Sequence, residues 1–408
     1  MTESIAQFDL RHPPAGFHDD PYPWYRQLRE SRPVHLSPDG SYLLTRYADC
    51  AQVYRESAAS SDKKKLFKPL FGDGLLYEHH TSSLVFCDPP YHTRVRALLA
   101  DALKPAAVRA MADSLRHLVN ALLDDIAARG EPVIDFVTQY AGAIPLAIIG
   151  DLLTVPLDER APLRNWSMCI LGALEFDLGP GGRSAGERAV SEFIDYLRSL
   201  VSRRKVVGAP RDGDLLGSLL ASHARGDLSE KELLHNCIFL LNAGHETTGH
   251  LLANGVYELL IRPGQLQQLR TEPSLMKSAI EEILRFQSPN QLGNRELTSD
   301  VDVGGARLPR GAQVTLVIGA ANRDPLRFHD PESFDIRRDP NPHLAFATGP
   351  HMCLGMALAR LEAQIALSVL LTRCPELRHA GPPLRAPRAR FRGVQGMPVH
   401  VGRVRPAA

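Results

Sequence analysis

The stretch AFATGPHMCLGMALARLE, residues 345–362, places one cysteine, Cys353, after a glycine-containing loop and directly before a strongly helical sequence. A lone cysteine is usually a small buried hydrophobe. The thiolate is the form that ligates metals, however, and backbone N–H donors and a helix N-terminus both stabilise it. Gly349 and Gly355 flank Cys353, where a tight loop and close approach of a cofactor would require the absence of a Cβ. With Phe346 in packing reach, these surroundings favour a ligand role for Cys353.

A second group of polar residues interrupts the largely apolar sequence HNCIFLLNAGHETTGHLLANGVYELL, residues 235–260. The pair His245-Glu246 is similar to the start of the His-Glu-x-x-His zinc motif, whose two histidines are one helical turn apart. The next histidine, His250, comes five residues after His245 and lies ~140° around a helix from it. This spacing excludes the zinc motif.

The same segment contains an acid beside an alcohol. Ala243 and Thr247 are one helical turn apart, and the small pair Ala243-Gly244 lets a flat cofactor or a diatomic molecule approach the backbone. Glu246 and Thr247 would then supply a proton route into a dry cavity. In the alternative interpretation, Thr247 donates to a backbone carbonyl and Glu246 forms a surface salt bridge. The residues alone leave both interpretations open.

The composition limits the class of protein. The 408 residues include 47 Lys and Arg and 46 Asp and Glu, and the net charge of +1 favours neither nucleic acid nor an anionic membrane as a partner. The six cysteines contain no Cys-x-x-Cys pair, which argues against a disulfide framework and for a reducing cytosol. The N-terminus has no apolar signal-peptide core, and the apolar tract at 141–150 is far shorter than the ~20 residues of a membrane span. We therefore expect a soluble cytoplasmic protein.

Helical periodicity dominates the chain, and since no repeat or low-complexity linker divides it, we expect one domain over residues 1–408. Apolar residues at intervals of three and four predict helices at Pro23–Arg29, Tyr91–Leu103, Val108–Arg129, Ala185–Arg204, Glu230–Ile261, Leu275–Arg285 and Leu358–Cys374. Strands of one small sheet are predicted at Val34–Leu36, Tyr42–Thr45, Gln313–Ile318 and Val399–Val401. The fold class is thus mainly α with minor β sheets.

The residues around Cys353 resemble a known signature. Phe346-x-x-Gly349-x-His351-x-Cys353-x-Gly355 resembles the haem-binding motif of the cytochrome P450 family, with Ala347 and Pro350 as departures from its usual bacterial form. Further motifs follow the family's order along nearly the whole chain. They are Asp20–Tyr25, Asp88–Arg96, Ala243–Thr248, the Glu-x-x-Arg pair Glu282 and Arg285, and Arg338. The resemblance implies the cytochrome P450 fold, with a long central helix over the haem.

The resemblance also implies a role for each motif residue. Cys353 would ligate the iron of haem b. The haem propionates would be held by His92, Arg96, Arg295 and His351. Ala243 and Gly244 would leave room for O2, and Glu246 and Thr247 would deliver protons. Glu282, Arg285 and Arg338 would lock the loop that carries the thiolate. Substrate would lie near Phe239, Ala243, Leu292 and Phe391, with Asn242, Asn290 and Gln291 as hydrogen-bonding groups or, alternatively, as amides that satisfy backbone.

The implied activity is insertion of one oxygen atom from O2 into a mainly apolar small organic substrate. Electrons would come from a ferredoxin or flavodoxin and its NAD(P)H-dependent reductase, docking where Arg94, Arg109 and His351 contribute positive charge. Two alternatives stay open. One is a peroxide-driven or atypical member of the same fold, and the other is a non-enzymatic haem sensor or electron carrier.

Overall fold

The computed structural model describes residues 5–176, 178–205 and 214–407. By its internal contacts the chain divides into two compact units. Unit 1 consists of Met1–Ala59, Ala112–Ile144 and Thr247–Ala408, and unit 2 consists of Ser60–Met111 and Pro145–Glu246. The prediction of a single domain over residues 1–408 stays a prediction.

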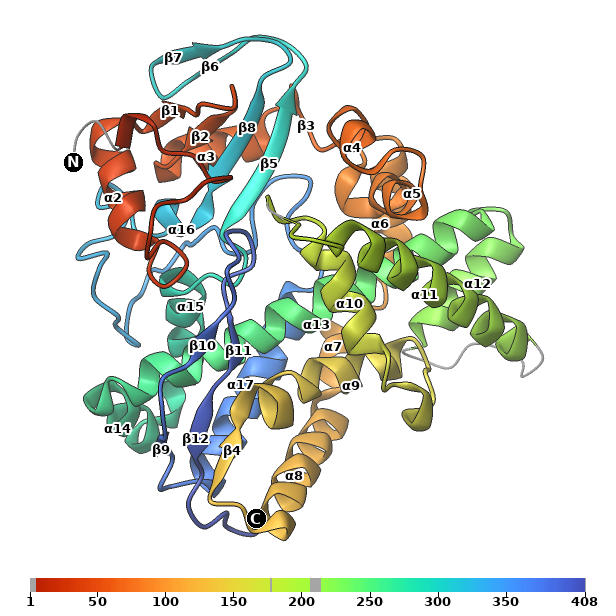
Figure 1. Ribbon diagram of the computed structural model, residues 1–408. Helices are drawn as coiled ribbons and strands as arrows, with labels where there is room; N and C mark the ends of the chain where they lie inside the picture. The colour runs from red at the N-terminus through yellow and green to blue at the C-terminus, as the bar shows by residue number, and fades with distance from the viewer. Residues whose placement is uncertain (1–4, 177, 206–213, 408) are drawn as a thin grey trace. The chain divides into compact units, whose positions relative to one another are not determined.

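Helices make up most of both units, in agreement with the predicted fold class (Figure 1). Unit 1 contains α2 (Tyr22–Ser31), α3 (Tyr47–Arg55), α8 (Ala112–Arg129), α14 (Pro263–Thr271), α15 (Met276–Phe286), α16 (Ile318–Ala321) and α17 (Met356–Arg373). Unit 2 contains α4 (Lys64–Phe71), α5 (Leu75–Ser82), α6 (Tyr91–Ala100), α7 (Pro105–Ala110), α10 (Leu163–Gly172), α11 (Gly182–Lys205) and α12 (Leu215–Ala224). Helices α9 (Ala143–Leu152) and α13 (Glu230–Leu260) have residues in both units.

The longest of these helices, α13, starts at a capping box. The amide of Ser229 donates to Oε2 of Glu232 at 2.7 Å, and the amide of Glu232 donates to Oγ of Ser229 at 3.2 Å. These reciprocal bonds satisfy backbone donors that a helix N-terminus otherwise leaves unpaired. The predicted helix over Glu230–Ile261 is therefore correct to within one residue.

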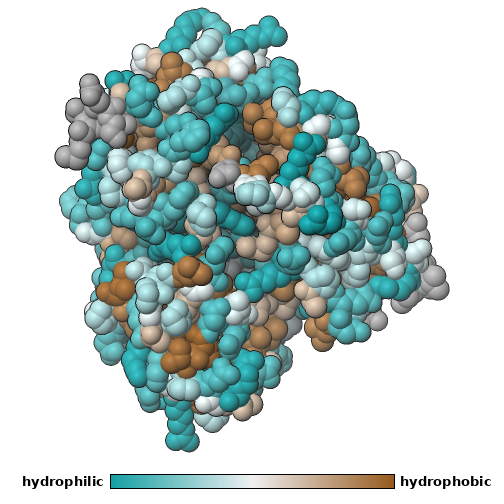
Figure 2. Space-filling model, in the orientation of Figure 1, coloured by the Kyte–Doolittle hydropathy of each residue, from teal (hydrophilic) through white to brown (hydrophobic). Residues whose placement is uncertain are grey.

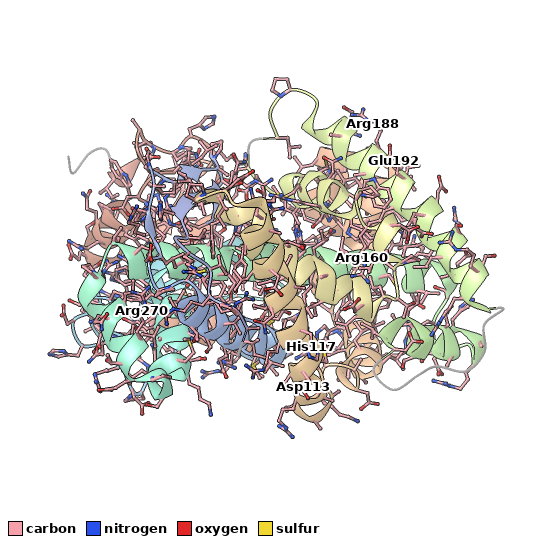
Figure 3. All side chains as sticks on the ribbon, turned by 90° about the horizontal axis from the view of Figure 1, so that it is seen from below. Asp113, His117, Arg160, Arg188, Glu192 and Arg270 are labelled. Atoms are coloured by element: carbon pink, nitrogen blue, oxygen red, sulfur yellow. The ribbon has the colours of Figure 1, made fainter. Side chains whose placement is uncertain are left out.

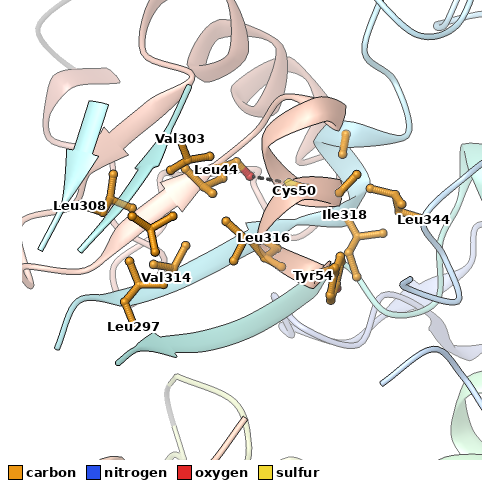
Figure 4. Close-up of a cluster of buried hydrophobic side chains, with 14 of the residues drawn as sticks. Leu44, Cys50, Tyr54, Leu297, Val303, Leu308, Val314, Leu316, Ile318 and Leu344 are labelled. Carbon is orange, nitrogen blue, oxygen red and sulfur yellow. Dashed lines mark hydrogen bonds between the residues drawn. The ribbon is translucent and has the colours of Figure 1, made fainter. Parts of the chain in front are cut away.

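The main sheet of unit 1 has the strand order β1 (Val34–Leu36), β2 (Tyr42–Leu44), β8 (Gln313–Val317), β5 (Leu292–Leu297) and β3 (Ala59–Ser60). Strands β1 and β2 form a hairpin, while β2 and β8 run parallel and β8 and β5 run antiparallel. Buried side chains such as Leu44, Val314 and Leu316 pack on this sheet, and the Cys50 thiol donates to the carbonyl of Leu44 at 3.2 Å (Figure 4).

One strand prediction is wrong in its partners. The C-terminal strand β12 (Pro398–His400) does not join the main sheet but pairs with β4 (Val133–Asp135) and β9 (Arg378–His379). Two further hairpins complete the strands of the described residues. They are β6 (Val301–Val303) with β7 (Ala306–Leu308), and β10 (Leu384–Arg385) with β11 (Val394–Gly396).

In unit 2, α10 and α11 pack along each other through Trp166, which stacks on Phe193 with ring centroids 5.0 Å apart. Arg160, labelled in Figure 3, stabilises the end of α9 by donating to the carbonyl of Ala147 at 3.0 Å and to Asp151 at 2.6 Å. The same helix carries Ile149, whose side chain lies close to Gly244 of α13.

Hydrophilic side chains predominate on the face drawn in Figure 2, where hydrophobic side chains form small separate patches. Among the helices that the structure describes, none has both the length and the apolar character for crossing a membrane.

Candidate active site

The loop before Cys353 is held in a tight backbone arrangement. The amide of Cys353 donates to the carbonyl of Phe346 at 2.9 Å, and the amide of Met352 donates to the carbonyl of Gly349 at 3.0 Å. Gly349 has φ +76°, and a Cβ there would lie 2.5 Å from the carbonyl oxygen of Tyr54. Glycine is therefore required at this position both by conformation and by packing.

Cys353 differs from the other cysteines in its exposure. It is solvent-exposed and lies three residues before the first residue of α17, where the field of the helix N-terminus favours an anion. Burial raises the pKa of the thiol to about 11 in Cys87, about 12 in Cys237 and about 11 in Cys374. An accessible sulfur near a helix N-terminus is the best thiolate ligand that this chain offers.

A buried cluster of charged groups joins α15 to the segment around Arg338 in unit 1. The side chains of Glu282 and Arg285 are both 0% exposed, and the guanidinium donates to the two carboxylate oxygens at 2.7 Å each. Arg338 donates to Oε2 of Glu282 at 3.1 Å. The three residues that the sequence grouped thus meet in one network.

A second ion pair anchors the helix that follows Cys353. Arg360 on α17 donates to both carboxylate oxygens of Glu281 on α15, at 2.7 and 2.8 Å, and lies over the Phe346 ring. Burial alone would raise the pKa of Glu281, but hydrogen bonds from His343 and Arg360 lower it to about 2. Sequence reasoning missed Glu281 and His343, because a carboxylate 79 residues from its arginine leaves no local pattern.

The middle of α13 has an open strip along one face. Between residues 233 and 253 the accessible positions are Phe239, Ala243, Gly244, Thr247 and His250, and all others are buried. Phe239, Ala243 and Thr247 follow one another at four-residue steps, so they share a helix face. Ala243 is exposed, whereas Asn242 before it is buried and Gly244 after it is partly buried. Such a strip leaves room for a flat group along the helix.

Two other positions on α13 depart from the sequence interpretation. Glu246 is only 3% exposed, so its carboxyl lies in the interior and not on the surface, where the alternative interpretation placed it. At Gly244 a Cβ would lie 2.6 Å from Cδ1 of Ile149 on α9. Helix packing therefore gives a sufficient reason for Gly244, while Ala243 borders the open strip.

The remaining candidates are spread over other elements. His92, 2% exposed, and the part-buried Arg96 are one turn apart on α6 in unit 2. In unit 1, Arg295 on β5 lies over the Tyr54 ring, and Leu292 at the start of β5 is buried. Phe391 is buried as well and forms an isolated β-bridge with Asn290.

The amides near these residues separate into two kinds. The Gln291 amide donates to the carbonyl of Ser288 at 2.7 Å, and the Asn290 amide oxygen accepts from the backbone of Leu292 at 3.4 Å. Both therefore satisfy backbone groups. Asn242 differs from both, because its buried Oδ1 accepts no hydrogen bond from a described residue.

Comparison with known proteins decides the family. The cytochrome P450 family model matches residues 173–383. The biotin biosynthesis cytochrome P450 of Bacillus subtilis is 34% identical over 394 residues, covering 94% of this chain and 96% of the relative. The chain belongs to the cytochrome P450 family.

Other comparisons agree over the full length. The cytochrome P450 monooxygenase PikC of Streptomyces venezuelae is 35% identical over 417 residues, covering 100% of this chain and 97% of PikC. The crystal structure of P450BioI with an acyl carrier protein that bears hexadec-9Z-enoic acid matches with a TM-score of 0.89 and 32% identity, covering 95% of this chain and 100% of P450BioI. This cytochrome P450 is thus a haem-dependent oxidoreductase of the monooxygenase type, which uses redox partners and a small substrate.

Proposed function

We propose that this cytochrome P450 binds haem b with Cys353 as the axial ligand and oxygenates a mainly apolar small organic molecule. The observation that carries the proposal is the exposed Cys353 thiol in a hydrogen-bonded loop before α17. The donor set fits the group. A thiolate suits the iron, imidazole and guanidinium groups suit the carboxylates of a haem, and Gly355 presents no Cβ while no described atom lies within 4 Å of that position.

Haem, when bound through a thiolate, supplies the activation of O2 and the insertion of one oxygen atom. The protein residues have separate tasks in this proposal. The imidazoles of His92 and His351 and the guanidinium groups of Arg96 and Arg295 would hold the haem propionates. Ala243 keeps the α13 backbone approachable. The Thr247 hydroxyl would position the group that donates the proton, and the buried carboxyl of Glu246 would supply protons to that group.

For its redox partners we propose a ferredoxin or flavodoxin with an NAD(P)H-dependent reductase, and hence a cytoplasmic location, where reduced nicotinamide nucleotides are available. Arg109 is exposed and available for docking. Arg94 already pairs with Glu232, so its charge is partly neutralised. The free thiols of Cys50, Cys87, Cys169, Cys237 and Cys374 agree with a reducing compartment.

The substrate is proposed to meet Phe239, Ala243, Leu292 and Phe391, which are apolar. A second form of substrate, an acyl chain attached to a carrier protein, is favoured by one observation, the similarity to P450BioI in its carrier-protein complex. Titration with a free fatty acid and with the same acid on acyl carrier protein distinguishes the two forms, because only carrier recognition makes the second bind more tightly.

The experiment that tests the axial ligand is the spectrum of the reduced carbon monoxide complex. The purified protein should show the strongly red-shifted Soret band of thiolate ligation. Cys353→Ala should lose this band, and the matched control Cys169→Ala should keep it. A Cys353→Ala protein that retains the band would overturn the assignment. Product formed equally well from hydrogen peroxide without a reductase would favour the peroxide-driven alternative.

A further inference from the structure

Three histidines gather in the interior of unit 2, apart from the candidate active site. His79 and His80 lie on α5, and His235 lies near the start of α13. Their exposures are 3%, 1% and 2%. The ring centroid of His79 is 5.2 Å from that of His80 and 5.6 Å from that of His235. Within the described residues no group of three or more His, Cys, Asp or Glu side chains could hold a metal ion, so metal ligation does not explain this cluster.

The surroundings of His80 are apolar. Its ring contacts the rings of Phe67, Phe71 and Phe86, at centroid distances of 5.4, 5.6 and 5.8 Å. Its Nε2 is closed off from solvent and has no hydrogen-bond partner in the described part of the chain. A protonated imidazole would lose its hydration there without gaining an acceptor at this nitrogen, so the packed state favours neutral His80.

Glu78 joins the histidine cluster to α13. Its Oε1 lies 3.0 Å from Nε2 of His235 and 3.4 Å from Nζ of Lys231, both on α13. Because Glu78 already faces an ammonium group, it can compensate the charge of one protonated imidazole at most. A second proton, on His79, would place two like charges in the protein interior on rings whose centroids are 5.6 Å apart.

Charged groups on α11 also face His235. Arg198 lines the same small cavity as His235, and its positive charge disfavours a proton on that ring. Arg198 is itself paired with Asp195 at 3.7 Å and with Glu230, the first residue of α13, at 3.5 Å. These two carboxylates thus bind the arginine, whereas Glu78 bonds the histidine.

The pKa values follow from these contacts. Burial lowers the pKa of His235, although the bond to Glu78 acts in the opposite direction. Burial and the neighbouring histidines lower the pKa of His79 well below 6.5, and burial together with His235 lowers the pKa of His80 to about 3. Burial alone would raise the pKa of Glu78, but the bond from His235 and the charge of Lys231 lower it below 4.5. The packed cluster is therefore neutral near pH 7, whereas histidines released into water take up protons below about pH 6.5.

We propose that His79, His80 and His235 form an acid-sensitive contact, which holds α5 against α13 at neutral pH and releases it as the pH falls to about 5.5. Protons bind the released histidines more tightly than the packed ones, so acid favours the released state. His235 is one helical turn before Phe239 on the same face of α13. Release of α5 therefore uncovers the end of the open strip that is nearest to the N-terminus of this helix.

The test is hydrogen exchange of the holoenzyme at about pH 7.5 and about pH 5.5, with each amide rate divided by its intrinsic rate at that pH. Peptides over residues 75–83 then report the opening constant of α5. Each histidine that is neutral when packed, and has its ordinary pKa of 6.5 when released, should raise this constant about tenfold between the two pH values. We expect a rise of about a hundredfold from His79 and His80 and a smaller factor from His235. An opening constant that is the same at both pH values overturns the proposal.

The matched variant is His79→Phe with His80→Phe, which keeps two aromatic rings but removes two proton acceptors. The pH effect on α5 should fall to about tenfold or less in this variant. The control His117→Phe changes an exposed histidine on α8 (Figure 3) and should keep the full rise. A double variant that still shows the hundredfold rise would assign the effect to other groups and overturn the proposal.

The wild-type protein decides the question even if the double variant does not fold. Its α8 peptides should show no rise between the two pH values, because the proposed contact holds α5 and not α8. A rise in α8 as large as that in α5 would mean that acid loosens the whole chain, and it would overturn the proposal.

Discussion

Removal of Arg285 should destabilise the protein by an amount that its contacts define. The guanidinium is 0% exposed and forms two bonds at 2.7 Å to Glu282. It also donates to three backbone carbonyls, at 2.9 Å to Asn322, 2.8 Å to Pro331 and 3.0 Å to Ser333. Arg285→Ala would leave these acceptors buried without this donor, at about 1 kcal/mol or more each.

Glu282 would not be left entirely alone by this change. It would still accept from Arg338 at 3.1 Å, from Asn341 at 3.1 Å and from the backbone of Asp335 at 2.8 Å. The lost pair and the unpaired carbonyls together place the expected cost at about 3–5 kcal/mol, the range for breaking a buried ion pair. The retained bonds make the lower end of this range the better expectation.

Two quantities are measured on the purified holoenzyme. The first is the midpoint of urea unfolding, and the second is the haem content of the protein that elutes as a monomer. Arg337→Ala is a matched control, because Arg337 pairs with Glu272 at 2.6 Å but both side chains are nearly half exposed, 46% and 48%. It should cost less than about 1 kcal/mol. Arg285→Ala with the same unfolding midpoint and haem content as Arg337→Ala would show that the network does not stabilise the loop.

Three further predictions test other parts of the structure. Thr247→Ala should keep the thiolate Soret band but yield more hydrogen peroxide and less product per NADH, and unchanged coupling would contradict the proton role. Burial raises the pKa of Glu362 from 4.5 to about 8, so the folded protein keeps a proton that the unfolded chain loses, and the contribution of this residue to stability falls as pH rises from 4.5 to 8. Glu362→Gln should remove this slope and add about 3 kcal/mol to the unfolding free energy at pH 7. Burial lowers the pKa of His79, His80 and His235, so their contribution to stability should fall as pH drops below about 6.5; in the Glu362→Gln protein, which lacks the opposite slope, a flat urea midpoint between pH 7 and 5.5 would contradict this.

The helices were predictable from sequence where periodicity was long and a cap was present, as in α13. The predicted helix Val108–Arg129 is in fact two, α7 and α8, separated at Met111. Apolar spacing continues through Met111, so the pattern gave no sign of the break. Strands of two or three residues, such as β4 and β9, were missed because two residues carry no detectable alternation. Their pairing with β12 depends on tertiary contacts between distant segments.

The candidate site was predictable to the extent that its chemistry is local in sequence. The loop from Phe346 to Gly355 carries its own pattern, and the Glu282 and Arg285 pair is one helical turn apart. In contrast, Glu281 and Glu362 are ordinary glutamates in the sequence, and only the folded structure distinguishes them, Glu281 by its bonds to Arg360 and His343 and Glu362 by its burial. The sequence also left two interpretations for the amides, and the structure separates them, since Gln291 bonds backbone while Asn242 does not.

The glycines show which parts of the sequence argument are explained by packing within the protein. A Cβ at Gly349 would clash with the Tyr54 carbonyl, and a Cβ at Gly244 would clash with Ile149, so packing explains both glycines. At Gly355 no described atom lies within 4 Å of a Cβ, so protein packing places no demand there. Gly355 lies two positions after the exposed thiol, and packing within the protein does not require its small size. A site for a flat cofactor does require a small residue at such a position. The functional argument therefore rests on Gly355 and Ala243 more than on the two glycines that the fold itself needs.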